Sequence, residues 1–438
     1  MSPARRRGRR AVLVAGRRTP FCKAGGVFEP LSAPDLGRIA LTELLLRSGV
    51  GADEIDAVVF GCAGSPADAA NPARVIALRS GLDHRTPALT VQRNCASGME
   101  AIVQALRLVE GGEAQVVACG GMESMSNYPI VFPRSYRRRL GKLARSKSVG
   151  AKISTALSFR ARDFKPEIAL LQGLTDPTCG LSMGQTAEVL ARELGIGRDE
   201  QDAHAVLSHQ RAAKAAERLA AEIVPVVSPG AKTTITADDA VRPEQSVAQL
   251  AKLRPVFARQ RGTVTPGNAC SVTDGACALL VADEAWAEKR GLTPLARLVT
   301  HSVAGVAPER MGLGPAAALP RALKSAGWTL DELGLVEINE AFAVQVLACV
   351  KVLADAELMK THADWPEALG ELSHDRLNVS GGAIALGHPV GVSGARIVLR
   401  LAHDLNERGL EKGAASLCVG GGQGQAVLLE RPADWGTA

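Results

Sequence analysis

The chain alternates two kinds of segment along most of its length: short apolar runs bounded by glycine, and longer segments whose apolar residues recur every three or four positions. The first pattern is typical of buried β-strands and the second of amphipathic α-helices. Strands that alternate with helices build largely parallel sheets, so we expect an α/β fold. The predicted strands cover residues 11–16, 57–64, 87–92, 115–121, 295–303, 335–340, 377–381 and 415–421.

One arrangement of these segments occurs twice. A helical segment at 97–112 precedes the strand at 115–121, and a helical segment at 389–409 precedes the strand at 415–421. Both helical segments place apolar residues on one face: Ile102, Leu106, Val109, Ile397, Leu401 and Leu405. The repetition predicts a duplicated unit, with two related sheets packed around buried helices.

Residues 122–275 differ from both halves, because they are richer in proline and charge and contain a helical stretch at 186–221. We therefore expect a loop domain inserted into the first half. The predicted division is 11–121 for the first part of the N-terminal half, 122–262 for the loop domain, 263–292 for the last part of the N-terminal half, and 293–431 for the C-terminal half.

The net charge of +6 is unevenly distributed. Residues 1–10 contain five arginines, and residues 134–165 contain eleven lysines and arginines against the single acid Asp163, while the rest of the chain is acidic. Within the second patch, residues 132–147 have the spacing of a short amphipathic helix. Such a patch is either a solvated surface or a docking site for phosphate, anionic lipid or an acidic partner.

The nine cysteines are odd in number and scattered, without CxxC or CxxH spacing. This usage indicates reduced thiols and no metal site, as in a cytoplasmic protein. The N-terminal arginines are followed at Ala11 by a predicted strand, which leaves too little length for a transit peptide. No apolar run reaches the ~18 residues of a membrane span, so we expect a soluble cytoplasmic protein.

Cys95 stands where a predicted strand ends and a predicted helix begins. The free N–H groups and the positive end of the helix dipole favour a thiolate, which predicts a lowered pKa for this thiol. A free cysteine is also a common buried apolar residue, so the position alone leaves both interpretations open.

His388 lies between Gly387 and Pro389, in a loop that enters a glycine-bearing helix. Proline stiffens the backbone there, and glycine lets another group approach closely. An imidazole held in this way suits the role of a base, with a structural histidine as the alternative.

Two further positions are undecided when each is taken singly. Cys418 ends a predicted strand and is followed by three glycines whose N–H groups can point at negative charge. Asn339 ends another predicted strand, where its amide could orient a water or an oxyanion or could simply form a cap.

In this order, the four positions resemble the thiolase family, and the similarity runs from about residue 11 to residue 430. It is carried by NCASGM at 94–99, NEAFA at 339–343, GGAIALGHPVGVSGAR at 381–396 and CVGGGQG at 418–424. The resemblance implies a thiolase fold, in which two duplicated βαβ-type halves pack as α/β/α/β/α layers with an inserted loop domain.

The resemblance also implies a role for each residue. Cys95 would be the nucleophile that becomes acylated, and His388 the base that takes its proton. Cys418 would be the second acid and base, because one cysteine cannot be acylated and carry protons in the same step. Asn339 would hold a water that, with His388, receives the thioester oxygen. The N–H groups of Cys95 and Gly420 would form a second oxyanion site at the acyl-enzyme.

Coenzyme A, as a substrate rather than a tightly bound cofactor, is expected to lie on the loop domain. The candidate contacts implied by the resemblance are Met183, Arg242, Cys270, Ala341 and Phe342. Two positions depart from the family pattern: Cys270 stands where many members have serine, and Ser182 where a histidine often precedes the methionine.

The implied function is a 3-ketoacyl-CoA thiolase that acts on medium or longer chains in fatty-acid β-oxidation. An acetoacetyl-CoA thiolase working in the condensing direction is the alternative. A non-catalytic thiolase-like lipid or acyl-CoA carrier is an alternative of another class, and it would lack at least one of the four site residues. Family likeness also implies a homodimer or tetramer.

The basic insert within 134–173 is longer than the matching region of short-chain biosynthetic thiolases. It is similar to that of thiolase subunits that work beside hydratase/dehydrogenase partners, so we hypothesise that it docks such a partner or an anionic membrane. A nucleic-acid partner is not expected, because the body is acidic and the chain has only 14 aromatic residues.

Overall fold

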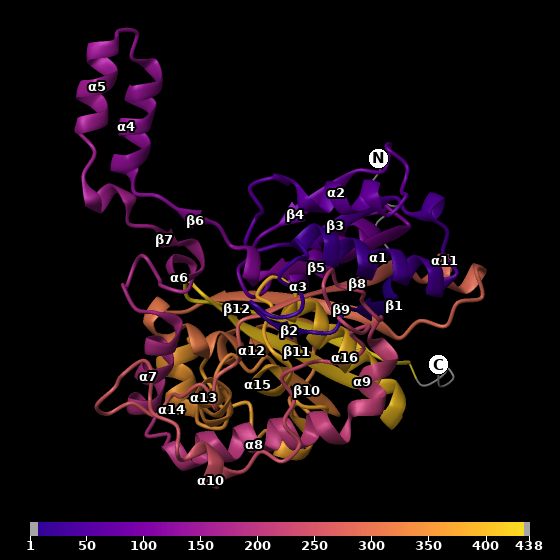
Figure 1. Cartoon of the computed structure of the whole chain (residues 1–438). Helices are drawn as coiled ribbons and strands as arrows, with labels where there is room; N and C mark the ends of the chain where they lie inside the picture. Colours follow the sequence, from indigo (N-terminus) through magenta and orange to yellow (C-terminus); the bar gives the residue numbers. More distant parts are fainter. Residues whose placement is uncertain (1–7, 433–438) are drawn as a thin grey trace.

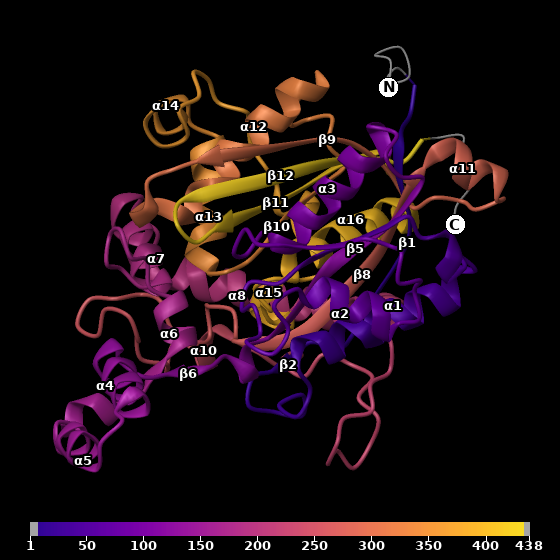
Figure 2. The ribbon, with the colours of Figure 1, turned by 90° about the horizontal axis from the view of Figure 1, so that it is seen from above.

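The computed structural model describes residues 8–432, so three of the N-terminal arginines, at positions 5–7, lie outside the described residues. Strands of both halves form one hydrogen-bonded order, β10-β11-β12-β9-β1-β8-β5-β3-β4, with the short β2 beside β8 (Figure 2). The strands are β1 Ala11–Arg18, β2 Cys22–Lys23, β3 Ala57–Gly61, β4 Ala88–Val91, β5 Val116–Ser124, β8 Thr273–Asp283, β9 Ala296–Gly305, β10 Leu335–Ile338, β11 Lys412–Val419 and β12 Gln423–Glu430.

This order is symmetric about the antiparallel contact between β1 and β9. Moving outward from that contact, β8, β5 and β3 on one side correspond to β12, β11 and β10 on the other. The sequence predicted the two halves but missed β8 and β12. β12 forms an antiparallel hairpin with β11, and β8 runs antiparallel to β1 and β5, which are both distant in sequence. The two expected sheets are therefore joined into one order through β1 and β9.

The predicted strand at 377–381 does not form. Only an isolated bridge pairs Leu377 with Val336. Asn378 has a φ of 48°, and its side-chain amide accepts a hydrogen bond from the Ile338 N–H at 2.8 Å and donates one to the Ile338 carbonyl at 2.8 Å. The side chain thus takes the place of a strand ladder at the position that β4 occupies in the other half.

Helices cover the sheet on both outer faces and fill the space between the halves (Figure 1). The outer helices are α1 Ala33–Ser48 and α2 Pro72–Arg79 on the N-terminal half, and α12 Gly314–Ala326, α13 Ala343–Leu353 and α14 Ala356–Ala363 on the C-terminal half. The central helices are α3 Ser97–Glu110 and α16 Ser393–Arg408, which pack on each other. Strand residues alternate between the two sides: Val116 and Ala118 of β5 face the outer core, and Val117 and Cys119 face the inner one.

The inner core confirms the predicted helix faces. All six apolar residues predicted to share a face in the two central helices are buried in it. Gly98 and Gly394 set how closely these helices approach, since a Cβ on Gly98 would lie 2.9 Å from the Ala395 nitrogen and one on Gly394 would lie 2.7 Å from the Met99 nitrogen. Glycine is required at both positions, and the first turns of α3 and α16 are therefore in contact.

The region between the halves is helical and extended in parts. The helical stretch predicted at 186–221 is split into α7 Met183–Glu193, α8 Arg198–Lys214 and α9 Ala216–Glu222. Its shorter elements are β6 Ile130–Val131, β7 Glu167–Ile168, α6 Ala169–Gly173 and α10 Val247–Leu250. Two more short helices lie in the halves themselves, α11 Glu284–Lys289 and α15 Ala383–Leu386. The basic segment forms a hairpin of α4 Arg134–Arg145 and α5 Val149–Leu157 that projects from the body (Figure 1).

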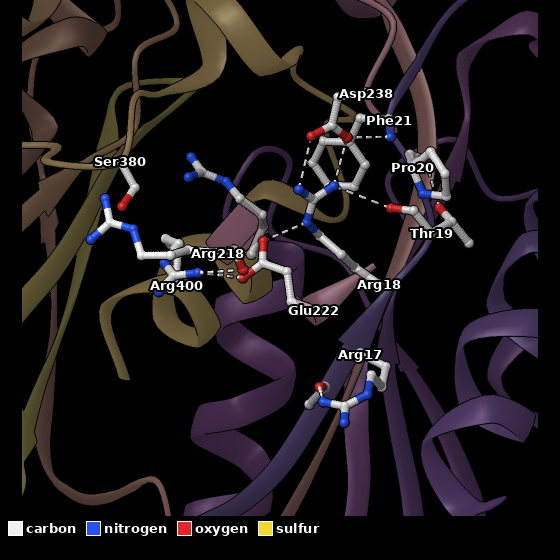
Figure 3. Close-up of polar contacts among 12 residues, drawn as sticks. Arg17, Arg18, Thr19, Pro20, Phe21, Arg218, Glu222, Asp238, Ser380 and Arg400 are labelled. Carbon is white, nitrogen blue, oxygen red and sulfur yellow. Dashed lines mark hydrogen bonds and ion pairs between the residues drawn. The ribbon is translucent and has the colours of Figure 1, made fainter. Parts of the chain in front are cut away.

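A buried ionic network ties the three parts of the chain together (Figure 3). Arg18 at the end of β1 is fully buried and contacts Asp238 through two hydrogen bonds of 2.6 and 2.8 Å. It also donates to Glu222 of α9 at 2.6 Å, and Glu222 accepts a second hydrogen bond from Arg400 of α16 at 3.3 Å. A buried charge that loses its partner costs several kcal/mol, so this network fixes the loop region against both halves.

Within residues 8–432, no helix combines the length and the apolar character needed to cross a bilayer. Over the same residues, no group of three or more histidines, cysteines or acids is placed to hold a metal ion.

Candidate active site

Cys95 lies in the turn between β4 and α3, two residues before the first residue of that helix. It is half-buried and lines a cavity of about 410 Å³, which we call the Cys95 cavity. Gly420, from the turn after β11, lines the same cavity, and its backbone N–H acts to lower the pKa of the Cys95 thiol. The Asn94 amide fixes the two turns together by donating to the Gly420 carbonyl at 2.8 Å.

The pKa of Cys95 differs from the sequence prediction. Burial raises the pKa of this thiol, and the N–H groups of Gly420 and of Cys95 itself offset only part of that effect. The carboxylate of Glu123 raises the pKa further. The expected lowering by the helix N-terminus is therefore wrong, because desolvation of the thiolate outweighs it, and this thiol needs a base.

His388 precedes α16 as Cys95 precedes α3, and it is 6% exposed. Its Nδ1 lies 2.6 Å from Ser393 Oγ, which in turn donates to the Pro389 carbonyl at 3.2 Å. If the serine proton goes to that carbonyl, Nδ1 carries the ring proton and Nε2 keeps its lone pair. Burial, with the nearby charge of Arg396, lowers the pKa of His388 to about 4, so at neutral pH the ring is neutral and has a lone pair free to accept a proton.

Nε2 of His388 is buried and has no hydrogen-bond partner among the described residues. His388 lines a second cavity of about 270 Å³, the His388 cavity, which is largely apolar. The two cavities share wall residues: Met125, Leu174, Thr175, Met183 and Val390. The nucleophile candidate and the base candidate therefore face adjoining spaces separated by one set of side chains.

Cys418 lies in β11, and Asn339 follows the neighbouring strand β10. Cys418 is 1% exposed within β11, and burial raises its pKa well above the usual value, with Cys95, Cys349 and Cys270 adding to the effect. Burial also raises the pKa of the Cys270 thiol, and Cys95 adds to that effect as well.

Asn339 follows β10 directly, and its N–H donates to the Ser416 carbonyl of β11 at 3.0 Å. Its side chain is fully buried, and neither amide atom has a hydrogen-bond partner among residues 8–432. A buried polar group left unpaired costs about 1–3 kcal/mol. An amide kept under these conditions is suited to a polar guest such as a substrate oxygen or a bound water.

Four of the five predicted CoA-contact residues lie near this site. Met183 begins α7 and lines both cavities, with its Sδ positioned 3.2 Å from where a Cβ on Gly420 would be. Cys270 and Phe342 line the His388 cavity. Ala341 is buried behind it and accepts the Cys270 N–H at 3.0 Å.

Arg242 lies elsewhere. Its side chain is exposed and lines neither cavity, while its backbone N–H donates to His209 Nδ1 at 3.2 Å. Ser182, which stands where a histidine is frequent, is the N-cap of α7: its hydroxyl accepts from the Gln185 N–H, and its own N–H donates to Gln185 Oε1 at 2.8 Å. The departure from the family pattern is thus compatible with a well-formed helix start.

Sequence reasoning missed two buried glutamates beside the site. Glu123 at the end of β5 accepts the N–H groups of Ala63, Gly64 and Gly391 at 2.8 to 2.9 Å, and so joins both halves. Glu340, within the NEAFA motif, contacts His204 Nε2 at 3.2 Å and accepts the Ser208 hydroxyl at 2.6 Å.

Burial alone would raise the pKa of Glu340, but hydrogen bonding and the charge of His204 lower it to about 2, with further hydrogen bonds from Ser208 and Asn378. A carboxylate held in the ionised state by a helix of the loop region fixes that helix against the turn that carries Asn339. The only indication in the sequence was an acid inside a run of apolar residues.

The family comparison settles what this arrangement belongs to. The model of the thiolase N-terminal domain matches residues 11–285, and that of the thiolase C-terminal domain matches residues 292–431. The chain belongs to the thiolase family. Thiolases are acyltransferases, and the resemblance inferred from the four motifs is confirmed.

Relatives of named function are similar over nearly the whole chain. An acetyl-CoA acetyltransferase of Chromobacterium violaceum is 39% identical over 425 residues, which cover 96% of this chain and 99% of that protein. A 3-ketoacyl-CoA thiolase of Yersinia pestis is 37% identical over 428 residues, with 97% and 98% covered.

Solved thiolase structures confirm the predicted fold class. The Bacillus anthracis acetyl-CoA acetyltransferase superimposes with a TM-score of 0.84 at 37% identity, covering 96% of this chain and 98% of that one. Human mitochondrial 3-ketoacyl-CoA thiolase in complex with CoA superimposes with a TM-score of 0.82 at 38% identity, covering 97% and 98%.

Proposed function

We propose that this thiolase is a 3-ketoacyl-CoA thiolase of fatty-acid β-oxidation, which uses CoA to cleave a 3-ketoacyl-CoA into acetyl-CoA and a shortened acyl-CoA. The observation that carries the proposal is that Cys95 and the backbone of Gly420 line one cavity, where the Gly420 N–H acts on the Cys95 sulfur and Asn94 ties the two turns together. An N–H that contacts the sulfur also lies beside the oxygen of any thioester formed on it. It can therefore stabilise negative charge there.

In the first half-reaction, His388 Nε2 takes the Cys95 proton, and the thiolate attacks the C3 carbonyl of the substrate. The C2–C3 bond breaks, the acyl group stays on Cys95, and the acetyl-CoA enolate leaves. Cys418 supplies the proton that converts the enolate to acetyl-CoA. The raised pKa of Cys418 suits this step, because a thiol kept protonated by burial is available as an acid.

In the second half-reaction, free CoA enters and the Cys418 thiolate takes the proton of its thiol. The CoA sulfur attacks the acyl-Cys95 carbonyl, and the shortened acyl-CoA leaves as Cys95 recovers its proton from His388. The N–H groups of Cys95 and Gly420 would hold the oxyanion at this stage. Asn339, through a water, and His388 would hold the thioester oxygen of the acetyl-CoA part.

The His388 cavity is the proposed path of the CoA pantetheine. Met183, Cys270 and Phe342 line it, and Phe257 packs edge-on against Phe342 with ring centroids 6.2 Å apart. An apolar passage with few polar groups suits a flexible chain that must slide past the nucleophile. Arg242, exposed and outside this cavity, remains a proposed contact for the outer end of CoA.

Turnover on four-, eight-, twelve- and sixteen-carbon 3-ketoacyl-CoA thioesters tests the proposal. We expect thiolysis of all lengths, with the highest kcat/KM above four carbons. A strong preference for the four-carbon substrate would favour the acetoacetyl-CoA thiolase, a reading supported by the acetyl-CoA acetyltransferase relative. Binding of acyl-CoA without turnover would favour the non-catalytic carrier, although none of the four site residues is missing.

A cytoplasmic homodimer or tetramer is part of this proposal. Light scattering on the purified protein tests the assembly state, since a monomer at assay concentration would contradict it. Cell fractionation tests the location.

We propose that the α4–α5 hairpin is a docking surface and that it binds an anionic membrane. Four arginines of α4, at positions 134, 137, 138 and 145, line one basic surface. On α5, Val149, Ile153 and Leu157 recur every four residues and are 74%, 55% and 82% exposed. Basic residues beside exposed apolar ones match the headgroups and acyl boundary of an anionic bilayer.

Arg139 is not part of that surface, because it forms an ion pair with the fully buried carboxylate of Asp163. The variant that tests membrane binding is therefore Arg137→Gln/Arg138→Gln, with Arg139 left intact. Loss of two charges should weaken binding to vesicles of phosphatidylcholine with phosphatidylglycerol by about 30-fold, at about 1 kcal/mol per arginine.

The matched control is Arg259→Gln/Arg261→Gln, which removes the same charge from exposed positions on the body. It should bind vesicles like the wild type. Equal loss in both variants, or stable capture of a hydratase/dehydrogenase subunit without vesicle binding, would contradict the membrane proposal.

A further inference from the structure

Tyr128 separates two cavities beside the nucleophile. On one side is the Cys95 cavity of about 410 Å³. On the other is a cavity of about 270 Å³, lined by apolar residues such as Pro66 and Ala67 as well as by the carboxylate of Glu123, which we call the Glu123 cavity. Among residues 8–432, Tyr128 is the one residue that lines both, so its side chain is the wall between them.

The wall is held in place from two directions. A Cβ on Gly64 would lie 2.2 Å from Cε1 of Tyr128, so the ring packs directly on the backbone there. The Tyr128 hydroxyl faces the carboxylate of Glu123, which is itself fixed by three backbone N–H groups. A ring anchored at its face and at its hydroxyl has little freedom to swing aside.

The Cys95 cavity is the space available to a group attached to the Cys95 sulfur. Apart from Tyr128, its lining includes Met125, Leu170, Leu174 and Pro308, which suit an alkyl chain. A chain that grows from Cys95 fills this apolar space first and is then stopped where the aromatic ring closes it.

We propose that Tyr128 sets the upper limit of acyl-chain length at Cys95 by closing the Cys95 cavity against the Glu123 cavity. This inference rests on the proposed thiolysis of 3-ketoacyl-CoA. Removal of the ring joins the two cavities and gives a longer chain room to continue. Each methylene that leaves water for the newly opened space increases kcat/KM about fourfold.

The test compares wild type, Tyr128→Phe and Tyr128→Ala on four-, eight-, twelve- and sixteen-carbon 3-ketoacyl-CoA substrates. Tyr128→Ala should raise the ratio of sixteen-carbon to four-carbon kcat/KM about tenfold or more. Tyr128→Phe keeps the ring and loses only the hydroxyl, so its chain-length profile should match that of the wild type. Tyr128→Leu should shift the ratio in the same direction by less, and it serves if the alanine variant does not fold.

Phe257→Ala is the control for a general loosening of the site, because Phe257 lines the His388 cavity and not the Cys95 cavity. It should raise the KM for CoA without changing the chain-length ratio. If the wild type cleaves none of the substrates, the proposed function fails. If the wild type cleaves them and neither Tyr128→Ala nor Tyr128→Leu changes the ratio, only the role of Tyr128 is overturned.

Discussion

The turns that enter the two central helices share a scaffold and differ in what their first serine binds. At the start of α3, Ser97 Oγ accepts the Arg93 N–H at 2.9 Å and donates to the Asn94 carbonyl at 2.7 Å. At the start of α16, Ser393 Oγ contacts the His388 ring at 2.6 Å. One serine bonds only backbone, whereas the other holds a side chain that can move protons.

In the proposed mechanism, this difference lets one duplicated unit carry two chemical roles. Where Ser97 bonds only backbone, no side chain among residues 8–432 hydrogen-bonds the Cys95 sulfur, which leaves the proposed nucleophile free to attack the substrate. Where the serine holds an imidazole, the tautomer and direction of that ring are fixed. Gly98 and Gly394 bring the two turns into contact, so the roles can be combined in one site.

The largest expected effect tests whether Cys95, in the turn before α3, is the nucleophile. Cys95→Ala should lower thiolysis by about 10⁴-fold or more, because no other group in its turn can form the thioester. Mass spectrometry of the protein after incubation with acyl-CoA should show loss of the acyl adduct. Cys179→Ser, which alters a half-buried cysteine that lines neither cavity, is the matched control and should keep its rate. Normal thiolysis by Cys95→Ala would remove the basis of the comparison.

The second turn is tested through its base. His388→Gln should lower kcat by about 10² to 10⁴-fold, the usual range for loss of a general base. Because burial lowers the pKa of His388 to about 4, the neutral form persists as pH falls from 7 and is lost only as pH passes through about 4. The wild-type kcat/KM should therefore show no acid limb from this group near its ordinary pKa of 6.5. An acid limb of the kcat/KM profile near pH 6.5 that disappears in His388→Gln would contradict this expectation, because it would mean that burial does not lower the pKa of His388.

Much of this arrangement could be predicted from the sequence, and the limits are physical. The central helices and most strands follow from hydrophobic periodicity, which depends only on which side faces a core. The strand at 377–381 fails because the amide of Asn378 replaces backbone pairing, an effect that periodicity does not contain. β8 and β12 were missed because antiparallel strands pair without a crossover helix, so they do not follow the strand-then-helix alternation used to find the others.

The site shows the same division. Sequence motifs identify Cys95, Asn339, His388 and Cys418 as candidates, but the pKa and the hydrogen bonds of each side chain depend on how deeply it is buried. The helix N-terminus was expected to lower the pKa of Cys95, and the desolvation that reverses this depends on contacts distant in sequence. Ser393 stood inside a motif used for the prediction, yet its bond to His388 appears only once the turn is folded.

Asn339 and Asn378 are two buried asparagines for which we expect opposite effects, one on catalysis and one on stability. Asn339→Ala should lower kcat by about 10² to 10³-fold, the range for loss of an oxyanion donor, with little change in melting temperature, since its amide has no protein partner among residues 8–432. Asn378→Ala should instead lower the free energy of unfolding by about 1–3 kcal/mol, because it leaves the Ile338 N–H and carbonyl unpaired. Steady-state kinetics and thermal unfolding of both variants check this, and the reverse pattern would contradict it.

The smallest expected effects belong to the two serines, and they test the comparison most directly. Ser97→Ala should lower the free energy of unfolding by about 1 kcal/mol, the usual cost of a lost hydrogen bond, and leave the pH profile unchanged. Ser393→Ala frees the Nδ1 side of the His388 ring, so kcat should fall about tenfold and the acid limb should move, while Ser393→Thr keeps the hydroxyl and should restore most of the activity. If both alanine variants lose only stability, the hydroxyl of Ser393 does not orient the base, and the two turns differ in composition rather than in role.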